Sequence, residues 1–72
     1  MTDDNASLKK IASRLRKARR AKQLTQVELA KKAGISISYY AQVEQSRINP
    51  TASKLLQIID ALGVSSKDIF GK

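Results

Sequence analysis

The 72-residue sequence contains no cysteine and no histidine. This composition excludes disulfides, thiol chemistry, zinc fingers and the imidazole that most often serves as general base near neutral pH. The 6 carboxylates are dispersed along the chain, and no nucleophile motif accompanies the serines and lysines. We therefore expect no enzymatic activity, no metal and no cofactor.

Glycine, proline and aromatic residues are scarce, whereas hydrophobic residues make up 42% of the chain. This balance favours a helical bundle over a disordered tail or a sheet sandwich. No apolar run approaches the roughly 20 residues of a membrane span. We expect a cytoplasmic protein without membrane contact, with a disordered polar N-terminus at residues 1–7 and a single domain at residues 8–72, since so short a chain cannot build two cores.

Positive charge is abundant: 14 lysines and arginines against 6 acids give a formal net charge of +8. The cations crowd into one segment, which contains Lys9, Lys10, Arg14, Arg16, Lys17, Arg19, Arg20 and Lys22. A polyanion is therefore the first partner to consider. The alternative is an ordinary solvated helix face.

Helical periodicity and capping residues divide the chain into five segments. Apolar residues at positions 8, 11, 12, 15 and 18 predict a helix over about 8–22. A capping box of Thr25 with Glu28 and a stop at Gly34 predict the next helix at 26–33. Its expected buried side consists of Val27, Leu29, Ala30 and Ala33.

The second half of the chain repeats these signals. Ser36 is the expected N-cap of a helix over 37–45. Asn49 and Pro50 are expected to open a fourth helix that ends at Gly63, and a capping box of Ser65 with Asp68 opens a short last helix ending near Phe70. The prediction is a compact, all-α, five-helix domain.

The helix over 37–45 is expected to have two distinct faces. Tyr40, Val43 and Glu44 share one side when residues are placed at about 100° intervals. The remaining surface offers four candidates for ligand contact: Ile37, Ser38, Tyr39 and Gln42. Glutamine pairs with adenine, serine bonds to several bases, and isoleucine packs against a thymine methyl. The alternative is that these are ordinary exposed residues.

The segment QVELAKKAGISISYYAQVEQ, Gln26 to Gln45, resembles the helix-turn-helix of the lambda-repressor-like family. That family includes phage repressors, Cro proteins and restriction-modification controller proteins. The stretches EQSRINP, starting at Glu44, and ALGVSSKDIF, starting at Ala61, are similar to it as well. The resemblance covers nearly all residues after Leu8 and implies a compact five-helix lambda-repressor-like DNA-binding domain.

The resemblance implies a recognition helix in the major groove, with the preceding helix lying across the DNA backbone. By position it assigns base readout to Ile37, Ser38, Tyr39 and Gln42, with Tyr39 at a place that contacts phosphate or a deformed step in some members. It assigns backbone contacts to Gln26, Ser36, Arg47 and Asn49.

The resemblance also pairs Arg19 with Glu44 in a partly buried structural ion pair. The alternative is that Arg19 is one more phosphate-seeking cation, but an inward Glu44 would then be an uncompensated buried charge.

Two residues depart from the family pattern. Tyr40 replaces a smaller aliphatic residue, which leaves open which tyrosine packs inward, and Ser46 stands where glycine is common.

Family members commonly dimerise through their C-terminal helices, so Val64 and Ile69 are expected at a homodimer interface. The alternative is that Val64 and Phe70 close the monomer core. The expected function is transcriptional regulation at a double-stranded, roughly palindromic operator, with RNA polymerase as a further candidate partner and no small-molecule effector. The rivals are an antitoxin-type protein-interaction module and a nonspecific basic nucleic-acid binder.

Overall fold

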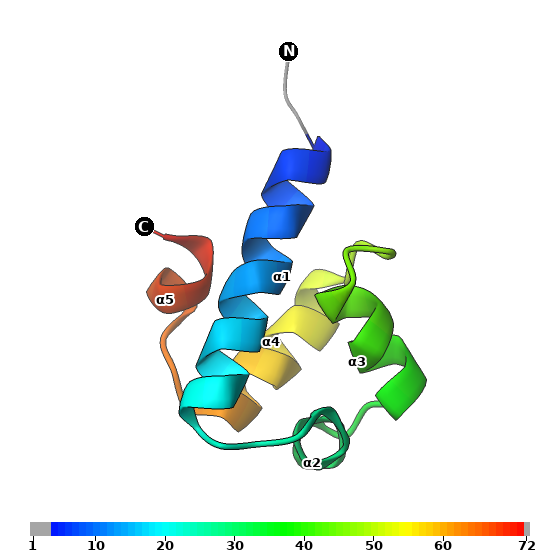
Figure 1. Cartoon of the computed structure of the whole chain (residues 1–72), viewed down its shortest axis with the longest axis vertical. Helices are drawn as coiled ribbons and strands as arrows, with labels where there is room; N and C mark the ends of the chain where they lie inside the picture. The colour runs from blue at the N-terminus through cyan, green and yellow to red at the C-terminus, as the bar shows by residue number, and fades with distance from the viewer. Residues whose placement is uncertain (1–3, 72) are drawn as a thin grey trace.

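The computed structural model describes residues 4–71, and within them it contains five α-helices and no strand. They are α1 (Asp4–Ala21), α2 (Gln26–Ala33), α3 (Ile37–Glu44), α4 (Ala52–Leu62) and α5 (Ser66–Phe70). Figure 1 shows α3 and α5 on opposite flanks of the long α1, with α4 behind it and α2 at its C-terminal end. The expected all-α, five-helix fold is confirmed.

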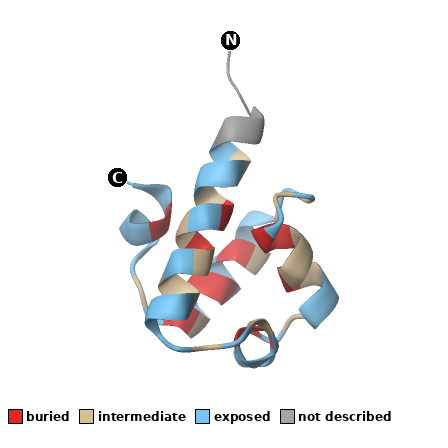
Figure 2. Cartoon of the chain, in the orientation of Figure 1, coloured by how far each residue is buried: buried red, intermediate tan, exposed pale blue. Residues whose placement is uncertain are grey.

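A single core joins all five helices, because each contributes one of the largest fully buried side chains. These are Leu15, Leu29, Tyr40, Ile58 and Ile69. Figure 2 shows the buried positions of every helix turned toward the same interior. Full burial of such a side chain contributes about 1.5–3 kcal/mol, so each of these residues helps to anchor its helix in the core.

The limits of α2 agree with its capping signals. The Thr25 hydroxyl accepts a hydrogen bond from the Glu28 backbone N–H at 3.0 Å, and the Glu28 carboxylate accepts one from the Thr25 N–H at 2.8 Å. At the other end Gly34 has a φ of 74°, the left-handed conformation that glycine adopts without strain. Both predicted boundaries of α2 are confirmed.

Two other helix starts differ from expectation. Helix α1 begins at Asp4, so residues 4–7 are helical and not part of a disordered segment; residues 1–3 lie outside the described range. Once the packed part of a helix has formed, each added residue gains one hydrogen bond, even in a polar sequence. Helix α4 begins after Thr51, whose hydroxyl accepts a hydrogen bond from the Lys54 N–H at 3.1 Å, and not at Asn49 and Pro50.

Val27 was expected on the buried side of α2, but its side chain is 52% exposed. Leu29, Ala30 and Ala33 are buried as expected. At about 100° per residue, Gln26 lies closer than Val27 to the centre of that inner face. The inner face of α2 therefore includes an amide.

The two apolar residues of α5 also exchange their expected places. Ile69 is fully buried in the monomer core, whereas Phe70 is 43% exposed. The Ile69 side chain is therefore unavailable to a partner, and its assignment to a dimer interface is wrong. Neighbouring residues of a helix point about 100° apart, so only one of the two can face the core in so short a helix.

None of the described helices has both the length and the apolar character that crossing a lipid bilayer requires.

Candidate nucleic-acid interface

Helices α2 and α3 are joined by a tight turn of Gly34, Ile35 and Ser36. The N–H of Ile35 donates to the Ala30 carbonyl at 3.0 Å, which closes the end of α2. The Ser36 hydroxyl accepts a hydrogen bond from the Tyr39 N–H at 3.0 Å, which caps the start of α3. Hydrogen bonds at both ends of the turn thus set the direction in which α3 leaves α2.

The inner face of α3 carries Tyr40, Val43 and Glu44, all buried. Tyr40 is the inward tyrosine, whereas Tyr39 is half-buried and packs against the edge of the core. The position that is usually a small aliphatic residue therefore holds a full aromatic ring with a hydroxyl.

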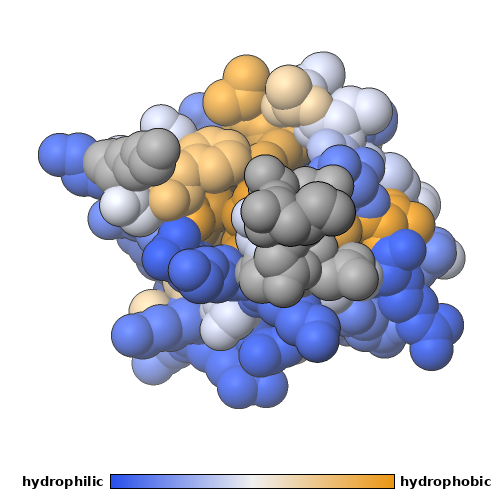
Figure 3. Space-filling view, turned by 90° about the horizontal axis from the view of Figure 1, so that it is seen from above, coloured by the Kyte–Doolittle hydropathy of each residue, from blue (hydrophilic) through white to orange (hydrophobic). Residues whose placement is uncertain are grey.

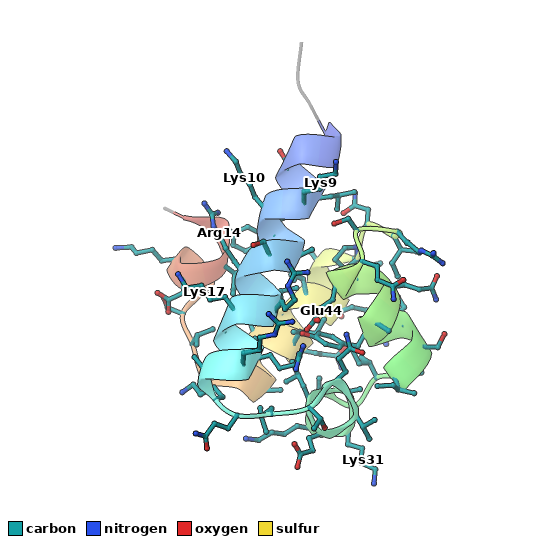
Figure 4. The ribbon with its side chains drawn as sticks, in the orientation of Figure 1. Lys9, Lys10, Arg14, Lys17, Lys31 and Glu44 are labelled. Atoms are coloured by element: carbon teal, nitrogen blue, oxygen red, sulfur yellow. The ribbon has the colours of Figure 1, made fainter. Side chains whose placement is uncertain are left out.

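The Glu44 carboxylate is the polar centre of this inner face, with only 4% of the residue exposed. Arg19 donates to it from Nε at 2.6 Å and from Nη2 at 3.1 Å. Gln26 donates from Nε2 at 3.0 Å, and the Tyr40 hydroxyl donates as well. Figure 4 shows Glu44 inside the domain, between α1 and α3. The expected ion pair of Arg19 with Glu44 is present, and two neutral donors complete it.

Arg19 also reaches the connection between α1 and α2, because its Nη1 donates to the Leu24 carbonyl at 2.8 Å. One guanidinium therefore holds α1, the segment before α2 and α3 in fixed relation. No buried side-chain nitrogen or oxygen in the described part of the chain lacks a hydrogen-bond partner. The cluster consequently leaves no unpaired charge in the core, the condition that makes buried ions tolerable.

The ionisation of this cluster follows from its contacts. Burial alone would raise the pKa of Glu44, but the hydrogen bonds from Arg19, Tyr40 and Gln26 outweigh it and hold that pKa below its usual value. The hydrogen bond to Glu44 raises the pKa of Arg19 despite burial. Burial, followed by the hydrogen bond to Glu44, raises the pKa of Tyr40. At neutral pH the cluster is a carboxylate held by a guanidinium, a phenol and an amide.

The outer face of α3 is different, being uncharged and open to solvent. Ile37 is 42% exposed, Ser38 is exposed, and Gln42 is half-buried. The Gln42 amide lies 3.3 Å from the Ser38 carbonyl and 3.4 Å from its hydroxyl, distances of weak hydrogen bonds that an outside partner can replace. The structure brings Ser38 and Gln42 together, with Ile37 on one flank and Tyr39 on the other.

The four residues assigned to backbone contacts flank the two ends of α3. Ser36 caps its N-terminus, whereas Arg47 and Asn49 are exposed just beyond its C-terminus. Gln26 is half-buried, and its amide nitrogen is engaged by Glu44 at the C-terminal end of α3. One hydrogen of that nitrogen and the amide oxygen remain for another partner.

The turn after α3 depends on Ser46, which has a φ of 60°. Its N–H donates to the Val43 carbonyl at 3.1 Å, and the Arg47 N–H donates to the Gln42 carbonyl at 2.9 Å. This pair of bonds is a Schellman motif, which places a residue in the left-handed conformation after the helix. Ser46 therefore adopts the backbone that glycine would adopt, and the turn fixes the start of the loop that carries Arg47.

Sequence reasoning missed the donor roles of Tyr40 and Gln26 toward Glu44. The spacing of four residues between Tyr40 and Glu44 places them on one helix face, and it was an available signal. The need of a buried carboxylate for more than one donor was another. Gln26 carried no such local signal, because its contact with Glu44 joins two helices.

Comparisons with known proteins match this arrangement. A family model described as helix-turn-helix matches residues 15–69. The immunity repressor protein of Bacillus phage phi105 is 40% identical over 62 residues, which cover 86% of this chain and 43% of the repressor. The chain belongs to the helix-turn-helix family.

Two further relatives of this helix-turn-helix protein are named as regulators. The cryptic phage CTXphi repressor RstR of Vibrio cholerae is 36% identical over 63 residues, 88% of this chain and 56% of the repressor. The uncharacterized helix-turn-helix-type regulator y4dJ of Sinorhizobium fredii is 38% identical over 61 residues, 85% of this chain and 79% of the relative. The chain thus spans about half the length of the two phage repressors.

The helix-turn-helix protein also shares its fold, over most of its length, with a solved structure. The restriction-modification controller protein C.AhdI of Aeromonas hydrophila superposes with a TM-score of 0.86 at 35% sequence identity. The match covers 90% of this chain and 98% of the controller protein. The expected lambda-repressor-like family and fold are thereby confirmed.

Proposed function

We propose that this helix-turn-helix protein is a sequence-specific transcriptional regulator that binds double-stranded DNA as a dimer, with α3 in the major groove of a roughly palindromic operator. The observation that carries the proposal is the division of α3 into two faces. Tyr40, Val43 and Glu44 fix the inner face, while the outer face keeps its polar groups available.

The chemistry of the outer face suits base edges. Gln42 offers an amide that pairs with adenine through two hydrogen bonds, and Ser38 beside it accepts or donates. Ile37 offers an exposed apolar group for a thymine methyl. The major groove is about 12 Å wide and admits a helix, and an uncharged face does not repel the phosphates on either side.

The surroundings of α3 suit the phosphates. Ser36 lies at the helix N-terminus, where free backbone N–H groups favour anions. Arg47 and Asn49 follow the C-terminus, and Gln26 lies near it. Contacts of this kind fix the register of the protein on the duplex but carry no sequence information themselves.

A dimer is proposed because a single α3 of 8 residues reads few bases. Two copies reading half-sites about 34 Å apart would double the contact and match a palindromic operator. Ile69 is excluded from the interface by burial, which leaves as candidates the half-buried Val64, in the connection between α4 and α5, and the 58% exposed Leu56 of α4.

The test begins with selection of bound sequences from a random duplex pool. It should enrich one symmetric site with two half-sites. Gln42→Ala should then lose about 1–3 kcal/mol of binding to the selected site, roughly 5- to 150-fold, and little on a scrambled duplex. Fluorescence anisotropy at fixed salt measures both affinities.

The control for this experiment is Gln57→Ala, which removes an exposed amide from α4 and should change neither affinity. Equal losses by Gln42→Ala on both duplexes would show that α3 does not read bases. A pool without an enriched sequence would instead identify a binder driven by charge alone.

A further inference from the structure

A second surface lies on the flank of α1 that faces α5, opposite α3 (Figure 1). It is a groove of about 380 Å³ lined by Ser7, Lys10, Ile11, Arg14, Phe70 and Gly71. Figure 3, which looks down on the N-terminal end of α1, shows apolar surface on this side with hydrophilic side chains around it. The reading face of α3 contributes no residue to it.

Arg14 has a fixed place in this groove. Its Nη1 donates to the Ile69 carbonyl at 3.1 Å, near the C-terminus of α5. Gly71 permits this position, because a Cβ at Gly71 would lie 2.8 Å from the same nitrogen. Among the residues whose side chains the structure describes, 7–71, this is the one hydrogen bond of the guanidinium, so its other N–H groups have no partner there. A guanidinium oriented in advance is suited to bind a carboxylate through two bonds.

Two further cations, Lys10 and Lys17, lie about one helical turn before and after Arg14. Figure 4 shows all three side chains along the flank of α1 that faces α5. The only salt bridge in the described part of the chain joins Arg19 to Glu44, so these three cations have no acidic partner there. Like charges three or four residues apart destabilise a helix by about 0.2–0.5 kcal/mol per pair. The row therefore does not stabilise the fold, and a negatively charged ligand would relieve its repulsion.

The groove also has an apolar side, formed by the exposed ring of Phe70 and by the half-buried Ile11. An apolar centre with a charged rim is typical of protein interfaces. The backbone of a DNA duplex would use the cations but would leave the Phe70 ring without a partner. A second copy of this chain would bring a net charge of +8 onto this row of three cations, so an acidic partner suits this face better.

We propose that this groove binds an acidic segment of another protein, which places a carboxylate on Arg14 and Lys10 and an apolar side chain against Phe70 and Ile11. The site uses none of the residues assigned to DNA. The protein would then hold an acidic protein partner and an operator on opposite flanks of α1.

The first test is a titration of the full chain with a fluorescein-labelled hexapeptide of two central leucines flanked by glutamates. Two control peptides replace the leucines by glycine and serine, or the glutamates by glutamine. Each control should bind at least about fivefold more weakly, because it lacks one of the two contacts. Equal binding of the peptide without leucines would reduce the site to simple charge attraction and overturn the proposal.

The second test compares matched variants. Lys10→Gln and Phe70→Ser should each weaken the acidic peptide by about threefold to fivefold, as expected for partly exposed contacts. Lys31→Gln and Val27→Ser remove an exposed cation and an exposed apolar group elsewhere, and they should change its affinity by less than about twofold. Circular dichroism checks that all four variants are folded.

Amide chemical shifts of the ¹⁵N-labelled protein locate the peptide without any DNA present. Perturbations should centre on Ile11, Phe70 and Gly71, with α3 unaffected. Perturbations centred on α3, or complete displacement of the peptide by a single-stranded oligothymidylate, would identify a general polyanion surface and overturn the proposal. The outcome is independent of whether an operator is found.

Discussion

The two faces of α3 differ in how far their polar groups are committed within the protein. On the inner face, the Glu44 carboxylate receives hydrogen bonds from three side chains of three helices. On the outer face, Gln42 makes only long contacts with its own helix. The comparison teaches that the orientation of α3 and its proposed DNA recognition depend on different residues of a single short helix. Each of the following changes tests one side of that division.

The largest effect is expected for Arg19→Ala. It leaves Glu44 as a buried carboxylate without its charged partner, which typically costs about 3–5 kcal/mol. Urea unfolding followed by circular dichroism measures the loss. Arg20→Ala is the control, because it removes an exposed cation one residue away and should stay within about 0.5 kcal/mol of the wild type. Equal effects of the two changes would mean that the inner cluster does not hold the fold together.

The second-largest loss of stability is expected for Tyr40→Phe. It removes the phenol that donates to Glu44 and keeps the ring, and a hydrogen bond to a charged group contributes about 1.5–3 kcal/mol. Tyr39→Phe provides a matched control, since the Tyr39 hydroxyl has no hydrogen bond in the described structure and its removal should change stability by less than about 0.5 kcal/mol. If the two substitutions were equivalent, the inward assignment of Tyr40 would lose its energetic basis.

Lowering the pH should reduce the free energy of unfolding by less than the two substitutions above. Because the pKa of Glu44 is held below its usual value, the stabilisation by this carboxylate is complete above the pKa of an unfolded glutamate, about 4.3, and is lost as pH falls through the lower folded pKa. The loss is limited, since burial already opposes the charged form. The free energy of unfolding of wild type and Glu44→Gln should therefore converge below about pH 4.3. Parallel pH profiles would contradict this assignment.

The smallest effect is expected at the turn after α3, where Ser46→Gly should stabilise the fold by about 0.5–1 kcal/mol, because glycine adopts a positive φ without strain. Gln45→Gly is the control: Gln45 has a φ of −88°, so glycine there only adds freedom to the unfolded chain and should destabilise. A loss of stability in both variants would mean that Ser46 is not strained.

Much of the difference between the two faces of α3 could be predicted from local signals in the sequence. The capping boxes, Gly34 and the wheel of α3 depend on contacts within a few residues, and they predicted the limits of α2 and the buried side of α3. The pairing of Arg19 with Glu44 came from the family pattern together with the inward position of Glu44. These features are encoded over short stretches of chain or at matched positions.

The sequence predictions were wrong where two residues suited a role equally well and only the tertiary structure distinguished them. Thr51 and Asn49 are both good capping residues, and the N-cap of α4 is Thr51. Ile69 and Phe70 are both apolar, and only Ile69 is buried in the core. Gln26 joined the Glu44 cluster through a contact between helices that no local pattern contains. The base and phosphate contacts stay predictions.

The Glu44 cluster also bears on how such a regulator can change its target during evolution. The Glu44 cluster that orients α3 contains none of the residues proposed to read bases, so Ile37, Ser38 and Gln42 are free to vary without disturbing it. A library randomised at these three positions should remain largely folded while its members prefer different sequences. Under the proposed function, the domain would be a scaffold on which new operator specificities arise through very few mutations.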